Sequence, residues 1–332
     1  MEKFRMAFVG CGGRANQVIY PAFNYHDDVE FCGICDIDLQ RLKTTADLYN
    51  VPEDKRYGQF GVYDYQRMLK EVRPDGVAVI GHPHIMYDIW EWCLMNGFNL
   101  YIEKPFAITV HQCRSLMYHA NKNNCTTQVS FQRRSTPCVM RAREECLKRG
   151  EITVAMCKFY KCEITPYTSA RDRLIDDGIH AVDTIRWMCG GNLVSLSSNM
   201  RAFMVPDYNI INAMMTFDNG STGILMTNWS SGKRIFGVEM HAPKIYVEAE
   251  HEVGANIYRD GSLTPEFISA EEAAGSSEYY IHSGLVNKTR DFIDCCRTKK
   301  PCESNFNDAY KTMEIAERIL AQSLLNLNVD GK

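Results

Sequence analysis

The fold is decided by residues 5–15, RMAFVGCGGRA, in which a short apolar run leads directly into a glycine-rich turn. The apolar run predicts a strand, and residues 15–24 predict a helix that starts straight after the glycines. A strand, a tight glycine turn and a helix N-terminus together form a cradle for a dinucleotide pyrophosphate. In this cradle Gly10 permits the turn, Gly12 lets backbone N–H groups approach the phosphates, and Ala15 allows close packing of the helix.

Asp36 supports the prediction of a nicotinamide cofactor. It follows the second strand-like run, residues 31–35, at about the distance from the glycine turn at which such folds hold a ribose-binding carboxylate. A carboxylate there binds both ribose hydroxyls and repels a 2′-phosphate, so NAD is favoured over NADP. The alternative role for Asp36 is the N-cap of a helix predicted over residues 39–49, and one residue can serve both purposes. Gly13 and Arg14 complete the predicted cofactor-binding turn.

Length and composition favour a two-domain cytoplasmic enzyme. The 332 residues exceed the size at which one core usually stops growing. A net charge of -4 gives no basic face, which argues against nucleic acid as a partner, and no apolar run is long enough for a membrane span. The 14 cysteines lack regular spacing and no secretory signal precedes them, which is typical of a reducing compartment. Cys32 and Cys35 lie on a predicted strand, and no second cysteine pair follows at a zinc spacing, so we expect no metal.

The N-terminal part alternates between apolar runs and helical patterns, which predicts βαβ units and a doubly wound parallel sheet over residues 1–124. The predicted strands cover residues 5–9, 31–35, 76–80, 99–102 and 126–131, and the predicted helices cover residues 15–24, 39–49, 65–72, 85–96 and 110–123. Gly81, His82 and Pro83 end the third strand at the edge where open α/β sheets bind ligands, so we expect them to contact the cofactor. The alternative is that His82 and His84 are loop residues without a chemical role.

The C-terminal part, residues 125–332, changes to an alternation of apolar and polar residues. This period of two predicts an α+β domain built on a large, mostly antiparallel open sheet. The predicted strands cover residues 152–165, 193–205, 210–217, 222–229 and 244–249, and the predicted helices cover residues 171–189, 284–297 and 306–325. The sequences DNGS at 218–221 and RDGS at 259–262 predict hairpin turns. One option for the last helix is that it packs back on the first domain.

Candidate catalytic residues follow a strand in the first domain and occupy a helix in the second. Lys104 comes after an apolar strand, so we expect its ammonium at the carboxyl edge of the sheet, where it stabilises a developing alkoxide. Glu103 is interpreted as a carboxylate on the cofactor side. Asp176 and His180 are four residues apart and share a helix face, and Asp183 lies close to that face. Histidine is well suited to accept a hydroxyl proton near neutral pH, so His180 is the predicted general base.

These residues together resemble the glucose-fructose oxidoreductase and inositol dehydrogenase family, often written Gfo/Idh/MocA, over nearly the whole chain. The resemblance rests on GCGGRA at 10–15, VIGHP at 79–83, EKP at 103–105 and LIDDGIH at 174–180 followed by Asp183. It implies a Rossmann domain, a C-terminal α/β domain whose open sheet mediates homodimers or homotetramers, and a sugar, sugar-derivative or cyclitol substrate. It also implies that Lys104, Asp176 and His180 form the catalytic trio.

The chain departs from the family pattern at two places. Residues 169–173, SARDR, stand where family members often have a glycine run, which implies a differently lined substrate pocket. Met86 and Tyr87 stand where a histidine is common, and Tyr87 is able to replace its hydrogen bond. Candidate substrate contacts, which are alternatively core or surface residues, are Tyr160, Tyr167, Arg171 and Trp229.

Three classes of function fit these residues. The leading hypothesis is net dehydrogenation of a secondary hydroxyl with NAD as a dissociable cosubstrate. The alternative is a redox-neutral enzyme that holds NAD tightly and transiently oxidises a glycoside or nucleotide sugar. Extra contacts to the cofactor are one role predicted for three arginines, Arg14, Arg133 and Arg134. The alternative is that they are surface or interface charges. The third class is a non-catalytic sensor, which should have lost the proton-transfer residues that this chain keeps.

Overall fold

The structure, a computed structural model, describes residues 2–327 and divides the chain into two compact units. The first unit is built from three segments, residues 1–130, 279–281 and 285–310, and the second from residues 131–278, 282–284 and the chain from residue 311. The predicted domains, residues 1–124 and 125–332, are continuous in sequence, whereas the compact units are not. Each unit is described by itself below.

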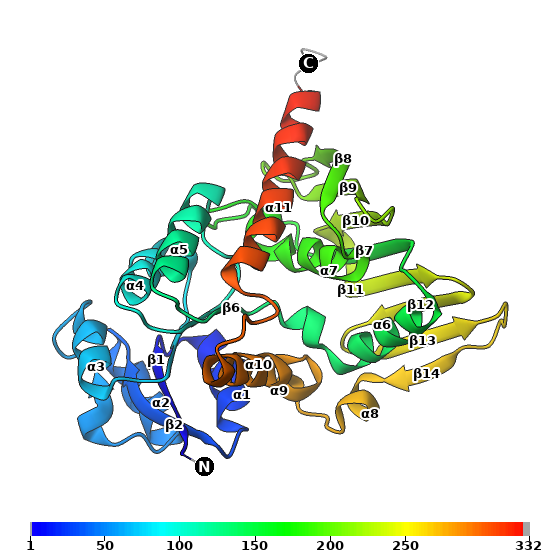
Figure 1. The fold of residues 1–332 in the computed structure, drawn as a ribbon. Helices are drawn as coiled ribbons and strands as arrows, with labels where there is room; N and C mark the ends of the chain where they lie inside the picture. Colours follow the sequence, from blue (N-terminus) through cyan, green and yellow to red (C-terminus); the bar gives the residue numbers. More distant parts are fainter. Residues whose placement is uncertain (1, 328–332) are drawn as a thin grey trace. The chain divides into compact units, whose positions relative to one another are not determined.

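The first unit contains a parallel sheet with the strand order β3-β2-β1-β4-β5-β6 in its described part. Figure 1 labels β1, β2 and β6 of this sheet. Its strands are β1 (Phe4–Val9), β2 (Val29–Cys35), β3 (Arg56–Tyr57), β4 (Gly76–Val79), β5 (Leu100–Ile102) and β6 (Thr127–Val129). The order reverses between β1 and β4, which is the switch point where doubly wound folds bind ligands. The predicted Rossmann sheet is confirmed, and only the two-residue β3 was not predicted.

Helices connect and cover these parallel strands. They are a π-helical turn (Ala15–Ile19) continued by α1 (Tyr20–Asn24), then α2 (Leu39–Leu48), α3 (Asp64–Val72), α4 (Pro83–Met95), α5 (Val110–Lys122), α9 (Tyr279–His282) and α10 (Leu285–Thr298), with a short 3₁₀ turn at Glu53–Lys55. Although α10 is distant in sequence, its Phe292 lies edge-on to the rings of Phe4, Phe23 and Tyr101. The core of the first unit therefore depends on residues beyond 284.

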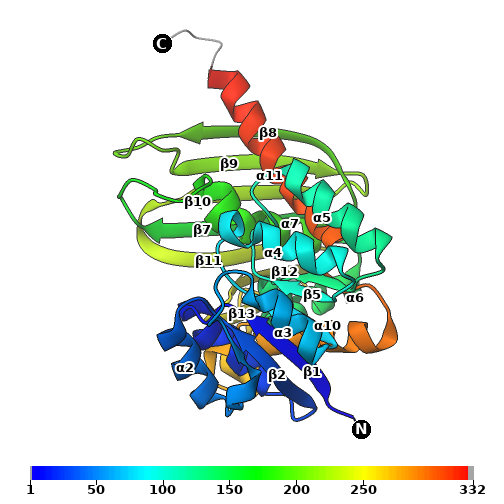
Figure 2. The same cartoon turned by 90° about the vertical axis from the view of Figure 1, so that its left-hand side faces the viewer.

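The second unit contains a sheet with the order β14-β13-β12-β11-β7-β10-β9-β8, and Figure 2 shows β11, β7, β10, β9 and β8 side by side. Its strands are β7 (Val154–Cys162), β8 (Leu193–Arg201), β9 (Ile210–Phe217), β10 (Thr222–Asn228), β11 (Ser230–Ala242), β12 (Ile245–Glu250), β13 (Gly254–Arg259) and β14 (Glu266–Ser269). All neighbouring pairs are antiparallel except β7 and β10, which confirms the mostly antiparallel sheet. The turns at 218–221 and 259–262 connect β9 to β10 and β13 to β14, as predicted.

Helices of the second unit cover one face of this sheet. They are α6 (Pro137–Arg149), a π-helical turn (Leu174–Gly178) continued by α7 (Ile179–Cys189), α8 (Ala270–Ala274) and most of α11 (Phe306–Leu327), with a 3₁₀ turn at Gln132–Ser135. A side chain at Gly223 of β10 would collide with Ile185 of α7, whereas Met214 and Met226 on the opposite face are exposed. The helix α6 and the strands β11, β13 and β14 were not predicted.

Within residues 2–327, no helix combines the length and the apolar character needed to cross a lipid bilayer.

Candidate functional site

The glycine turn after β1 has the geometry of a phosphate cradle. Gly10 has a φ of +102°, and a Cβ at this position would lie 2.1 Å from the carbonyl oxygen of Ile80, so no side chain fits. At Gly12, no atom of the described residues other than Gly12 and its chain neighbours lies within 4 Å of where a Cβ would stand, so the turn is open on this side. At Gly13 the nearest atom is 3.9 Å away, in Gln17. The exposed backbone of this turn fits a dinucleotide pyrophosphate.

Asp36 is fixed beside this turn by two backbone groups. Its Oδ2 accepts the N–H of Cys11 at 2.5 Å, and its Oδ1 accepts the N–H of Asp38 at 2.8 Å. The N-cap of α2 is Asp38, whose carboxylate accepts the N–H groups of Gln40 and Arg41 at 3.1 Å each. The alternative prediction that Asp36 caps this helix was therefore wrong, because the residue two positions later does so. The carboxylate of Asp36 stays available to ribose hydroxyls, since each oxygen accepts more than one hydrogen bond.

An ion pair links the glycine turn to the end of β5. The Nε of Arg14 lies 3.5 Å from Oε1 of Glu103, and the Glu103 side chain is buried. Burial lowers the pKa of Arg14, whereas the negative charge of Glu103 raises it, and the net effect is an increase. Lys104 follows, half-buried, and the peptide bond from Lys104 to Pro105 is cis. This pair fixes the strand end that carries Lys104 against the cradle.

The third group at this edge follows β4. Pro83 begins α4 and His82 is its N-cap residue, while the rings of His82 and His84 lie 5.6 Å apart. Next to them, Tyr87 donates its hydroxyl to Glu91 at 3.1 Å, within the same helix. The residues predicted to bind the cofactor thus follow β1, β2, β4 and β5, which are consecutive in the sheet. Their convergence is a property of the doubly wound order, because parallel strands end at one edge.

In the second unit, the helix that carries Asp176 and His180 begins with the π-helical turn at Leu174–Gly178. Such turns often occur at functional sites. Oδ2 of Asp176 accepts the hydroxyl of Tyr167 at 2.6 Å, so a candidate substrate residue and a candidate catalytic residue meet. Burial and the Asp176 carboxylate raise the pKa of Tyr167. His180 is 9% exposed, and its ring lies edge-on to Phe131.

Asp183 belongs to a buried ion pair. Arg134 binds both of its oxygens, through Nε at 2.5 Å and through its second nitrogen, and the hydroxyl of Thr312 donates to Oδ1 at 2.9 Å. Both charged side chains are almost fully buried. The interpretation of Arg134 as a surface charge was therefore wrong, and the pair instead fixes α7 and its His180. Arg133 lies over the ring of Phe236 at 4.7 Å and pairs with Glu252 at 3.6 Å.

The other candidate substrate residues have different surroundings. Trp229 is fully buried, donates its Nε1 to Asp177 at 2.7 Å and packs against the π-helical turn at Gly178. Arg171 pairs with Asp172 and Glu317. Tyr160 lies on the face of the sheet opposite α7, where its hydroxyl is 3.9 Å from Sδ of Met226.

A further polar group near Asp176, the carboxylate of Asp177, was not predicted to have a role. Asp177 accepts Trp229 and pairs with Nζ of Lys161 at 2.6 Å, so it joins β7 and the residue after β10 to the π-helical turn. The available signal was the doublet of carboxylates, Asp176 and Asp177, at the start of an otherwise apolar helix. Two adjacent acids in such a place require separate partners inside the fold.

Family models match both units of the chain. The Gfo/Idh/MocA model described as an oxidoreductase family with an NAD-binding Rossmann fold matches residues 4–131. The Gfo/Idh/MocA C-terminal domain model matches residues 165–245. Together the two matches cover more than half of the chain, and the first one identifies a nicotinamide-dinucleotide-binding fold.

Individual proteins are similar at lower identity. D-apiose dehydrogenase from Paraburkholderia graminis is 22% identical over 96% of this chain and 87% of its own length. D-glucoside 3-dehydrogenase from Escherichia coli is 27% identical over 56% of this chain, and this match spans only about half, 54%, of that relative. The crystal structure of a dehydrogenase from Chromobacterium violaceum superposes with a TM-score of 0.87 at 18% identity, covering 100% of this chain and 98% of that one.

Proposed function

The chain belongs to the Gfo/Idh/MocA family of NAD(P)-binding oxidoreductases, and from this premise we propose that it transfers a hydride between NAD and a secondary hydroxyl of a sugar, sugar derivative or cyclitol. The observation that carries the proposal is the ion pair between Arg14 and Glu103, which joins the phosphate cradle to the strand end with Lys104. A cofactor bound in the cradle then has a cationic side chain near its reactive end.

The preference for NAD over NADP rests on Asp36. Its carboxylate is fixed at the end of β2 by two backbone N–H groups, and the ribose of the cofactor would meet it there. A 2′-phosphate would place negative charge against this carboxylate. The residues proposed to hold NAD are Gly10, Gly12, Gly13, Arg14, Ala15, Asp36, Gly81, His82, Pro83, Glu103 and Lys104.

In the proposed mechanism each unit supplies part of the chemistry. His180 accepts the proton of the substrate hydroxyl, and Lys104 stabilises the oxygen as its negative charge develops. Asp176, positioned by the hydroxyl of Tyr167, binds a second substrate hydroxyl or orients the imidazole. The bound nicotinamide supplies the hydride acceptor. In this mechanism Lys104 and His180 act on the same substrate hydroxyl.

Two side chains complete the proposed substrate site, while two of the expected ones are assigned elsewhere. Tyr167 is retained because it bonds to Asp176, and Arg171 is retained because it precedes the same π-helical turn. Trp229 is buried, so we propose that it supports the site through Asp177. Tyr160 is assigned to the exposed sheet face, which we propose as the contact between copies in a homodimer or homotetramer located in the cytoplasm.

The alternative function is a redox-neutral reaction with tightly held NAD on a glycoside or nucleotide sugar. The likeness to D-glucoside 3-dehydrogenase supports a glycoside as substrate. The test that separates the two is NADH formation by the purified protein with added NAD across monosaccharides, cyclitols, glycosides and nucleotide sugars. Accumulation of NADH with one class supports net dehydrogenation. An altered sugar product without NADH supports the alternative. If no class of compound gives either NADH or an altered product, both proposed functions are contradicted.

A further inference from the structure

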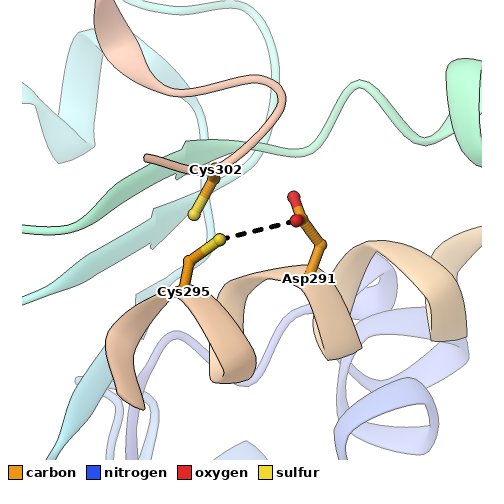
Figure 3. A group of neighbouring side chains, drawn as sticks. All are labelled: Asp291, Cys295 and Cys302. Atoms are coloured by element: carbon orange, nitrogen blue, oxygen red, sulfur yellow. Dashed lines mark hydrogen bonds between the residues drawn. The ribbon is translucent and has the colours of Figure 1, made fainter. Parts of the chain in front are cut away.

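Three potential metal-binding side chains meet in α10 and the segment that follows it. Asp291 and Cys295 are four residues apart and share a face of α10, and Cys302 comes from the segment that follows the helix. One ligand atom of each lies within 4.8 Å of the other two. Figure 3 shows both thiols beside the carboxylate, with Sγ of Cys295 at 3.5 Å from Oδ1 of Asp291.

The charge of Asp291 is not balanced by a basic side chain. Nearby Arg290 pairs with Asp28 and Asp294, and Lys288 pairs with Glu303. The carboxylate of Asp291 accepts hydrogen bonds from the thiol of Cys295 and from the backbone N–H of Glu303, the latter at 3.2 Å. It forms no ion pair with any residue between 2 and 327. A carboxylate beside two buried thiols and a backbone N–H therefore lacks a counter-charge, which a bound cation would supply.

The donor set identifies the class of cation. In a tetrahedral zinc site the metal lies about 2.3 Å from sulfur and about 2.0–2.2 Å from oxygen, so a neighbouring sulfur and oxygen are roughly 3.5 Å apart. The distance between Cys295 and Asp291 has this value. Thiolates select Zn²⁺ over Mg²⁺ or Ca²⁺, which prefer oxygen ligands.

We propose that Asp291, Cys295 and Cys302 form a zinc site, with a solvent molecule as the fourth ligand. Binding replaces the two thiol protons, which leave to solvent, and no atom changes its oxidation state. Cys302 lies two residues before Ser304, which donates its hydroxyl to Val129 of β6 at 2.7 Å and accepts the Val129 N–H at 2.9 Å. The ion thereby fixes the segment after α10 next to β6, inside the first unit.

The test measures zinc on the whole reduced protein, independently of turnover. We expect one Zn²⁺ per chain after dialysis, release of protons during titration, and a thiolate-to-metal charge-transfer band when Co²⁺ replaces Zn²⁺. Cys302→Ser and Asp291→Asn should weaken zinc binding by at least about tenfold, the lower end of losses measured at metal sites. Cys296→Ser is the matched control, because Cys296 is the next residue on α10, is also buried and lies outside the cluster.

Three outcomes overturn the proposal. The first is a wild-type protein that gives no cobalt–thiolate band. The second is equal loss of zinc in Cys296→Ser and Cys302→Ser. The third is a disulfide between Cys295 and Cys302 in peptides from the protein purified without reductant, combined with no zinc binding after reduction. If a variant fails to fold, the native wild-type protein answers the same question, because bound Zn²⁺ should protect two thiols from chemical modification. Absence of this protection contradicts the site.

Discussion

The hydroxyl of Tyr167 and the carboxylate of Asp176 illustrate how single residues prepare the candidate site. Their hydrogen bond of 2.6 Å fixes the carboxylate from one side. Burial and the adjacent negative charge raise the pKa of Tyr167, so the phenol stays a donor at neutral pH. An acid held in this way is oriented before a substrate arrives, which reduces the cost of ordering it during reaction.

The proposed roles of Lys104 and His180 predict a loss of turnover without a loss of cofactor. Lys104→Ala or His180→Ala should lower kcat by a factor on the order of 10² or more, because proton transfer and oxygen stabilisation are removed. The affinity for NAD should remain within about tenfold of wild type. Steady-state kinetics and NAD titration by intrinsic fluorescence measure the two quantities. Equal losses in both would assign these residues to the structure.

Asp36→Ala should change the choice of cofactor. Removing the carboxylate should weaken NAD binding and reduce discrimination against NADP, because the repulsion of a 2′-phosphate disappears. The ratio of kcat/KM for NAD and NADP is the measurement. Asp38→Ala is the control, since it removes the N-cap of α2 and the pair with Arg41 but leaves the Asp36 carboxylate in place. An unchanged ratio in Asp36→Ala would remove this residue from the ribose site.

Among the elements, α7 and the turn before it carry the second half of the proposed site. The ion pair between Arg134 and Asp183 and the hydroxyl of Thr312 fix this helix from inside the second unit. All of these groups are buried, so their charges are not screened by water. The position of His180 thus depends on charges that no solvent molecule can replace.

Asp183→Asn should therefore be strongly destabilising. It leaves the Arg134 cation buried beside a neutral amide, which costs about 3–5 kcal/mol. Asp47→Asn, which weakens the exposed pairs of Asp47 with Lys43 and Arg56, should cost much less. Urea unfolding of both variants gives the free energies. Similar losses in the two variants would show that the buried pair contributes little.

Sequence periodicity predicted elements better than it predicted contacts. The strands β7 to β10 and β12 alternate because one face of the sheet is covered and the other is not, and this pattern is local. The helix α6 was missed although Pro137 opens it and Gly150 follows it, because these signals fall where the period changes. The pairing of Arg134 with Asp183 spans 49 residues and depends on packing, so no local pattern contains it.

For the whole molecule, the acid stability depends in part on His251. Its ring is buried, donates its Nδ1–H to the backbone carbonyl of Phe236 at 3.2 Å, and lies 4.6 Å from the aromatic ring of Phe236. Burial, together with the charge of Arg133, lowers its pKa to about 3. The unfolded chain binds this proton near pH 6.5. The folded state therefore binds fewer protons between these values, and its stability decreases as the pH falls through that window.

His251→Asn should flatten this pH dependence, because the amide keeps a hydrogen-bond donor and does not titrate. Between pH 6 and pH 4 the wild type should lose up to about 1.4 kcal/mol per pH unit more than the variant. Urea unfolding across this range measures the difference. Parallel curves for the two proteins would mean that His251 is not the group responsible.

The exposed face of the second sheet predicts self-association. Met214 is exposed and faces Ile224 of the neighbouring strand, on the side without α7. Met214→Lys should shift the sedimentation profile toward smaller species, because a buried cation would oppose the contact. Leu263→Lys, in an exposed turn, is the control and should leave the profile unchanged. A wild-type protein that sediments as a monomer would contradict the predicted interface.

The placement of Phe292 in the core of the first unit has a consequence for protein synthesis. The Rossmann sheet is complete at Val129, but the ring that fills its core leaves the ribosome more than 160 residues later. Domains usually fold in order as the chain emerges. Here the N-terminal sheet must wait, with its apolar face open, until the second sheet has been made. We therefore expect folding of the first unit to be delayed until α10 has been translated, and the apolar face of the sheet needs protection until then.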